Sequence, residues 1–259
     1  MRRKAIVAAA LVTAAVALPG AAGARTLAMI KDSGAIALCA HPNALPFASK
    51  DGKRHGFQVE MAEALARQLG VGLTEDWVIT RYDVFRTDCD LVMDAIDDQE
   101  AQGETGLRLS KPYGRSGIVL AVREGEKGIA SLKDLSARNK VGVLVSSVAA
   151  MTLEERGIDT VPDLFEDELL TMVGKREIDA AAVTPIAVGY YNLTHPKQKL
   201  RIIHAFDGEP NFTWNIAVGL RRPDPELRQA IDAALDKLLA NGTAKRIYAR
   251  YGVELRPPK

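Results

Sequence analysis

The 259-residue sequence is poor in the residues that build metal and redox sites, with two cysteines, Cys39 and Cys89, and four histidines. It holds no CxxC or HExxH motif, so the commonest cysteine and histidine metal motifs are excluded and no metal or other cofactor is predicted. The formal net charge is only +1, so no basic excess indicates a nucleic-acid partner. After residue 24, no apolar run reaches the roughly 20 residues that a spanning helix needs.

The N-terminus has the three parts of a secretory signal peptide. Arg2, Arg3 and Lys4 precede an uncharged apolar run over residues 5–18, and Ala22 and Ala24 suit an A-x-A cleavage site. We therefore predict that residues 1–24 are removed and that the mature chain is exported to the periplasm. The alternative is a membrane anchor, for which the apolar run is short.

The two cysteines are predicted to form a disulfide. An exported chain matures in an oxidising compartment, where a lone pair of cysteines usually becomes bonded. The alternative is two buried free thiols. Bonding Cys39 to Cys89 would close a loop of about 50 residues, which the chain-entropy model values at roughly 4 kcal/mol.

Apolar periodicity predicts an α/β unit at the start of the mature chain. We expect a helix over residues 57–69, because Phe57, Met61, Leu65 and Leu69 recur every four residues and Gly70 suits a C-cap. Short apolar runs predict buried strands over residues 35–41, 73–79 and 88–96. This order of strands and helix is typical of a parallel sheet.

The same rhythm restarts in the middle of the chain. A helix is expected within residues 163–179, where Leu164, Glu168 and Met172 are spaced by four, and another after Asp224 and Pro225. The middle unit begins and ends at strands, which predicts two α/β lobes joined by two crossing strands. We expect the first lobe over residues 25–117 and 214–259, and the second over residues 118–213. The remaining strands are predicted over residues 116–122, 140–145, 180–184, 200–206 and 215–220.

Three stretches resemble a known family. "SLKDLSARNKVGVLVSS", "GKREIDAAAVTPIAVGYY" and "AVGLRRPDPELRQAIDAALDKLLANGTAKRIYARYG" are similar to the family 3 extracellular solute-binding proteins of ABC transporters. The resemblance implies the type II periplasmic-binding-protein fold, whose lobes close on a small-molecule ligand. It also implies an ABC permease as partner, and we expect a monomer.

The first lobe resembles a narrower group. "CAHPNALPFASKDGKRHGFQVEMAEALA" and "RTDCDLVM" look like the J proteins of methanol-oxidation clusters, which are encoded beside quinoprotein alcohol dehydrogenases. That resemblance implies a periplasmic quinoprotein dehydrogenase as the alternative partner.

The residues at the family's ligand positions differ from those of amino-acid binders. Gln102 or Gly103 stands where the resemblance places an Arg for the α-carboxylate, and Thr184 where it places an Asp for the α-ammonium. His41 replaces a pocket Asp and Ala44 a stacking aromatic. Without the bidentate Arg clamp, we expect the ligand not to be a standard amino acid.

Residues 94–104 carry five carboxylates and no basic residue. Asp94, Ala95 and Asp97 match positions that touch ligand in the family, and strand carboxyl ends border the cleft in open α/β sheets. With His41 they predict a negative, oxygen-rich wall suited to a cationic or metal-bearing ligand, or to a basic patch on a partner. The alternative is a solvated loop, and the spacing matches no EF-hand.

Further candidate ligand-binding residues lie in loops. Ser146 and Ser147 are expected at a helix N-terminus, where amides and hydroxyls favour an oxygen of the ligand, or where they simply cap the helix. Asn43 and Phe47 follow the first strand, and Phe47 is either a pocket or a core residue.

Three functions follow from these patterns. We predict a periplasmic binding protein that delivers a solute to an ABC transporter. The alternative is an accessory protein of a PQQ-dependent alcohol dehydrogenase. An enzyme on the same fold, such as a dehydratase, lyase or lytic transglycosylase, is not expected, because no catalytic constellation is evident.

Overall fold

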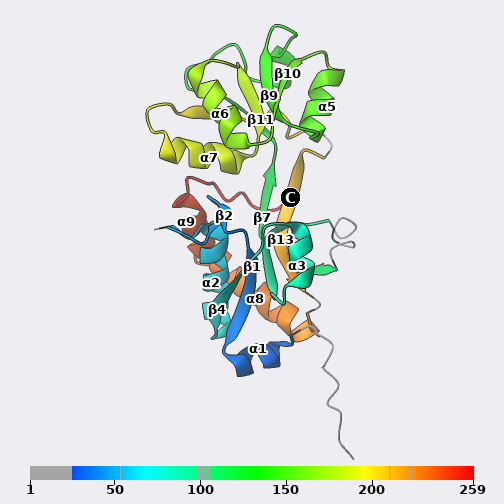
Figure 1. The fold of residues 1–259 in the computed structure, drawn as a ribbon, viewed down its shortest axis with the longest axis vertical. Coiled ribbons are helices and arrows are strands. Elements are labelled where there is room, and N and C mark those ends of the chain that lie inside the picture. The colour runs from blue at the N-terminus through cyan, green and yellow to red at the C-terminus, as the bar shows by residue number, and fades with distance from the viewer. Residues whose placement is uncertain (1–24, 53, 99–101, 103–105, 210, 222) are drawn as a thin grey trace, which may run out of the picture.

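The computed structural model describes residues 25–259 except 53, 99–101, 103–105, 210 and 222. The predicted signal peptide and much of the acidic stretch therefore lie outside the described residues. The described part forms two α/β lobes stacked along the long axis and joined by strands at the centre (Figure 1). No helix of this part is long and apolar enough to cross a membrane.

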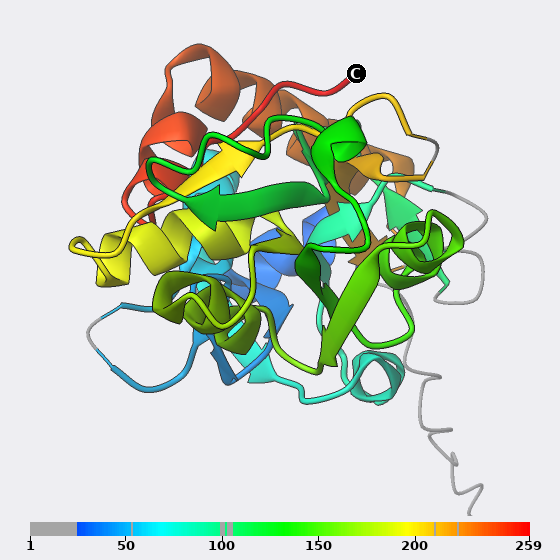
Figure 2. The ribbon, with the colours of Figure 1, turned by 90° about the horizontal axis from the view of Figure 1, so that it is seen from above.

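The first lobe holds the N-terminal elements and the C-terminal helices. Its N-terminal part comprises α1 Leu27–Ser33, β1 Ala35–Ala40, β2 Asn43–Ala44, β3 Ala48–Ser49, α2 Phe57–Leu69, β4 Gly72–Trp77, α3 Arg81–Arg86, β5 Leu91–Ile96, β6 Leu107–Leu109 and β7 Gly114–Gly117. The chain returns in β13 Thr213–Arg221, α8 Pro225–Ala240 and α9 Thr243–Ala249. Viewed from above, these C-terminal helices, coloured orange to red, lie along one edge of the molecule (Figure 2).

The first sheet has the order β4-β1-β5-β13-β6, and β7 also pairs with β13. β1 runs parallel to both β4 and β5, whereas β13 is antiparallel to β5, β6 and β7. The predicted helix over residues 57–69 is confirmed as α2, with Gly70 in the left-handed conformation at its C-cap. Its apolar face packs with α8 and α9 in the main core of this lobe.

The second lobe is an independent α/β layer. It comprises β8 Val119–Arg123, the 3-10 turn Leu132–Asp134, β9 Lys140–Leu144, α5 Val148–Glu155, β10 Asp159–Asp163, α6 Glu166–Lys175, β11 Ala180–Val183, α7 Pro185–Thr194 and β12 Leu200–Ile203. The sheet order is β10-β9-β11-β8-β12. Leu120 and Val122 pack on the α5 side, whereas Val119 and Ala121 pack against α6 and α7. β8 is therefore apolar on both faces, as expected for a strand in a sheet with helices packed on both sides.

Two sequence predictions need correction. The predicted strand over residues 116–122 is two strands, because Ile118 separates β7 in the first sheet from β8 in the second. The helix within residues 163–179 begins at Glu166, and Leu164 lies before it with its side chain 72% exposed. Its buried face is formed by Leu169, Leu170 and Val173 instead.

The lobes touch through α7 as well as through the connecting strands. Ile186 of α7 joins the core of the first lobe. Gly189 lies so close to Gly252, which follows α9, that a Cβ on Gly189 would stand 2.2 Å from the Gly252 carbonyl oxygen. Figure 1 shows α7 directly above α9. Only glycine permits this approach of two backbones.

The predicted disulfide is present. Cys39 of β1 and Cys89, two residues before β5, are bonded with their Cα atoms 5.4 Å apart. The bond forms because β1 and β5 are neighbours, with Leu38 opposite Leu91. It therefore ties the loop before β5 to the centre of the first sheet.

We expect Cys39→Ala/Cys89→Ala to lower the free energy of unfolding by about 4 kcal/mol, because the unfolded chain regains the entropy of a large loop. Urea denaturation of both proteins measures the change. Wild type unfolded with a reducing agent serves as the control and should behave like the double variant. Two free thiols in unreduced protein recovered from the periplasm would contradict the assignment.

Candidate functional site

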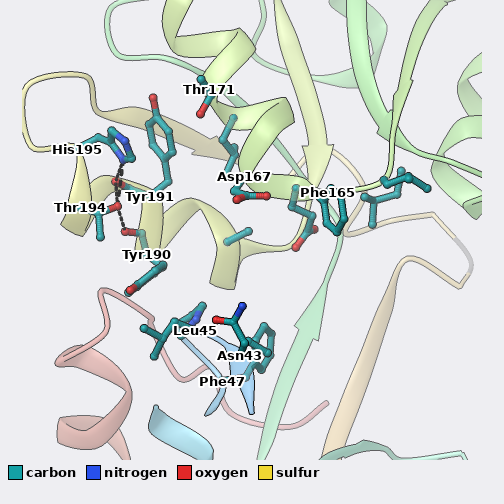
Figure 3. Close-up of a pocket in the computed structure, with 17 residues that line it drawn as sticks. Asn43, Leu45, Phe47, Phe165, Asp167, Thr171, Tyr190, Tyr191, Thr194 and His195 are labelled. Atoms are coloured by element: carbon teal, nitrogen blue, oxygen red, sulfur yellow. Dashed lines mark hydrogen bonds between the residues drawn. The ribbon is translucent and has the colours of Figure 1, made fainter. Parts of the chain in front are cut away.

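A cavity of about 680 Å³ lies between the lobes. Residues 43–47, after β1, form its floor, and α6, α7 and the residues before α6 form its roof (Figure 3). The predicted residues Asn43 and Phe47 line it. Phe47 also packs against the core residue Phe57, with ring centroids 5.2 Å apart, so it lines the cavity and contacts the core at once.

Asp94 is held inside a hydrogen-bond network of the first lobe. Its Oδ1 accepts from the hydroxyls of Tyr113 at 2.5 Å and Tyr248 at 2.6 Å, and its Oδ2 accepts from Gln58 at 2.8 Å. Both tyrosines are buried. Loss of solvent raises the pKa of the Asp94 carboxyl, and these three hydrogen bonds lower it by less. The carboxylate is thus already occupied by protein donors.

The backbone explains how Asp94 reaches this network. Its φ is 55°, in the left-handed region that aspartate tolerates better than most residues. Its own N–H donates to the Tyr113 hydroxyl at 3.1 Å. Asp94 therefore joins the end of β5 to the residue before β7 and to α9.

The neighbouring predicted residues are spread over different environments. Ala95 is buried against Leu109 and Ala217. Asp97 is exposed, and its N–H donates to the Asn215 carbonyl. The Gln102 side chain donates to the Ile96 carbonyl, whereas Gly103 lies outside the described residues.

His41 lies in the loop after β1. It is partly exposed, and its Nδ1 accepts from the Asn43 N–H at 3.1 Å. Among the described residues, no group of three or more His, Cys, Asp or Glu side chains is placed to hold a metal ion.

Two of the three predicted residues of the second lobe, Ser147 and Thr184, are helix caps. Ser147 caps α5 by accepting from the Ala150 N–H. Ser146 precedes it, exposed, with φ of 56°. Thr184 caps α7 through the Ala187 N–H. The cap reading of Ser147 therefore holds, and neither serine is among the described residues that line the cavity.

Glu166 is a site residue that the sequence analysis missed. Glu166 lines the cavity, and its carboxylate accepts from the Thr184 N–H at 2.5 Å and from the Thr184 hydroxyl at 2.9 Å. Thr184 itself does not line the cavity. In the sequence Glu166 is one of three acids at a helix start, a pattern that helix-dipole effects explain without a ligand.

Aromatic and apolar side chains complete the walls. Phe165 is 61% exposed at the cavity rim. Tyr191 stacks on His195 with ring centroids 4.2 Å apart. Figure 3 shows Tyr190 on the side of α7 that faces the loop bearing Leu45.

Two lobes, two connecting strands and an interlobe cavity define a periplasmic-binding-protein fold. Residues 36–254 match the bacterial extracellular solute-binding proteins, family 3, and the chain belongs to that family. The predicted fold and family are thereby confirmed.

Relatives of known description support the same assignment. The probable amino-acid-binding protein YxeM of Bacillus subtilis is 25% identical over 93% of this chain and 92% of its own. The L-cystine-binding protein TcyJ of Escherichia coli is 27% identical over 79% of this chain and 77% of its own. The membrane-bound lytic murein transglycosylase F of Desulfosudis oleivorans is 27% identical over 88% of this chain but only 50% of its own.

Solved structures share the fold. The L-cystine solute receptor of Neisseria gonorrhoeae, in its unliganded open conformation, superposes with a TM-score of 0.74 at 21% identity, covering 90% of this chain and 99% of its own. The periplasmic binding protein XoxJ of Methylobacterium extorquens superposes with a TM-score of 0.67 at 20% identity, covering 85% and 98%. At such identities the likeness concerns the fold alone.

Replacing Asp94 tests its structural role. Asp94→Asn should lower the free energy of unfolding at neutral pH by about 1–3 kcal/mol, because the amide cannot accept from all three donors. The exposed Asp97→Asn is the matched control and should change stability by less than about 0.5 kcal/mol. Urea denaturation measures both.

The pH dependence of the free energy of unfolding tests whether the pKa of Asp94 is raised in the folded protein. A raised folded pKa contributes stability that is fully present below the unfolded pKa, near 3.8, and is lost as pH rises through the folded pKa. The stability difference between wild type and Asp94→Asn should therefore shrink as pH rises above about 4. A difference that grows with pH would contradict the buried-carboxyl assignment.

Proposed function

We propose that the protein is a periplasmic binding protein that captures a small solute between its two lobes and delivers it to an ABC transporter. The single observation that carries the proposal is the cavity of about 680 Å³ lined from both lobes. A volume of that order suits a small molecule. The lobes would comprise residues 25–117 with 214–259, and residues 118–213, and would close by rotating about the connecting strands.

The proposed solute is not a standard α-amino acid, although YxeM and TcyJ are described as amino-acid and cystine binders. No Lys or Arg is among the described residues that line the cavity, so the α-carboxylate has no charged clamp there. Thr184 has no charge for an α-ammonium, and its hydroxyl already donates to Glu166.

The proposed compartment follows from the signal peptide predicted over residues 1–24 and from relatives such as the lysine/arginine/ornithine-binding periplasmic protein of Escherichia coli. The proposed partner is an ABC permease, and the protein would act as a monomer. We propose a binding role, not an enzymatic one. Transglycosylase F of Desulfosudis oleivorans, a relative with an enzyme's name, has about twice the length that this chain matches.

A second candidate is an accessory protein of a PQQ-dependent alcohol dehydrogenase. The first-lobe motifs around Cys39 and Cys89, which form a disulfide in this chain, favour it because they resemble those of the J proteins. Gene context separates the two roles: a permease and ATPase beside the gene favour transport, and a quinoprotein dehydrogenase favours the accessory role.

Binding measurements test the proposed ligand class. A thermal-shift screen of small solutes should find at least one that raises the melting temperature, because a ligand that binds only the native state stabilises it. Calorimetry with the common α-amino acids should give no submicromolar Kd, since the carboxylate clamp is missing. The solute found by the screen serves as the positive control, and tight binding of any common amino acid would disprove the restriction.

A further inference from the structure

Glu166 lines the interlobe cavity, and hydrogen bonds fix the position of its carboxylate. Both carboxylate oxygens accept hydrogen bonds from Thr184, so the side chain is held at the start of α6 and cannot turn away freely. Thr184 is in turn fixed as the cap of α7. The carboxylate is therefore already positioned before a ligand binds, so less side-chain entropy is lost on binding.

This charge has no cationic partner among the described residues. No Lys, Arg or His side chain in that part of the chain forms an ion pair with Glu166 or with its neighbour Asp167. Burial raises the pKa of the Glu166 carboxyl, hydrogen bonds from Thr184 lower it, and Asp167 raises it again. A carboxylate removed from water without a counter-charge is costly, and a bound cation would offset that cost.

The rest of the cavity suits an organic cation. Phe47 from the first lobe and Tyr190 from the second both line it, and aromatic rings attract cations through their faces. The one basic lining residue in the described part, His195, is stacked on Tyr191 and interacts through Nδ1 with Thr194. No ammonium or guanidinium is therefore placed there by the described residues to hold a ligand's carboxylate or phosphate.

We propose that this cavity binds an organic cation that lacks a carboxylate, with Glu166 as its anionic anchor and the aromatic walls around its apolar part. The ligand class is an amine or a guanidinium compound. This inference rests on the proposed solute-binding function and narrows it. It places the cation at Glu166 of the second lobe, whereas the sequence analysis expected it at the acidic residues 94–104 of the first lobe.

Three matched pairs of probes test the ligand class: agmatine with arginine, cadaverine with lysine, and histamine with histidine. In each pair the cationic side chain is the same and only the α-carboxylate differs. Calorimetry at neutral pH should show at least one amine binding about tenfold or more tightly than its amino acid, because one unpaired buried charge costs that much. Equal or tighter binding of all three amino acids would overturn the proposal.

Glu166→Gln tests the anchor. It should weaken the bound amine by about tenfold or more, because a charge-assisted contact is lost, while circular dichroism and the melting temperature without ligand check the fold. Glu168→Gln, an exposed acid of the same helix that does not line the cavity, is the matched control and should bind like wild type. Asp167→Asn, at the cavity wall, should show a smaller loss.

The outcomes separate this inference from the proposed function. If Glu166→Gln binds the amine as tightly as wild type, or if wild type binds none of the amines but captures another solute, the cation assignment is wrong and solute capture stands. If no solute of any class raises the melting temperature of wild type, the proposed function itself fails.

Discussion

The antiparallel pairing of β7 with β13 is the constraint on which the two-lobed architecture depends. Gly114 to Gly117 lie opposite Ile216 to Thr213, so the chain leaves the first lobe and returns to it through adjacent strands. A Cβ on Gly117 would stand 2.5 Å from the Phe212 carbonyl oxygen, so glycine keeps these strands close. Two adjacent strands therefore connect the lobes.

The position of the cavity depends on the contact between α7 and the first lobe. Ile186 enters the core of the first lobe, and Gly189 meets Gly252 backbone to backbone. This contact holds the underside of α7 close to the first lobe, and the loop bearing Asn43 and Phe47 comes to lie opposite α6. The space between them is lined by both lobes, so its shape depends on their relative position.

Asp94 and Glu166 both have a raised pKa, but their carboxylates lie in different surroundings. Asp94 is enclosed by Tyr113, Tyr248 and Gln58 of its own lobe, so its charge serves the fold. Among the described residues, the Glu166 carboxylate is hydrogen-bonded by Thr184 alone, and Glu166 lines the cavity. The carboxylate is therefore held within the fold in the first case and belongs to a cavity-lining residue in the second.

The sequence by itself determined the local elements and the family. The four-residue spacing from Phe57 to Leu69 fixes the buried face of α2, and Asp224 with Pro225 fixes the start of α8, because these signals act within one or two helical turns. Two cysteines alone were enough to indicate their pairing.

Only the tertiary structure decided which groups the carboxylates of Asp94 and Glu166 contact. Whether Asp94 meets tyrosines or a ligand, and whether Glu166 meets water or a cavity, depends on residues as distant in the chain as Tyr248 and Asn43. Such contacts leave no period or spacing in a sequence, because they are set by tertiary packing between segments that are distant in the chain.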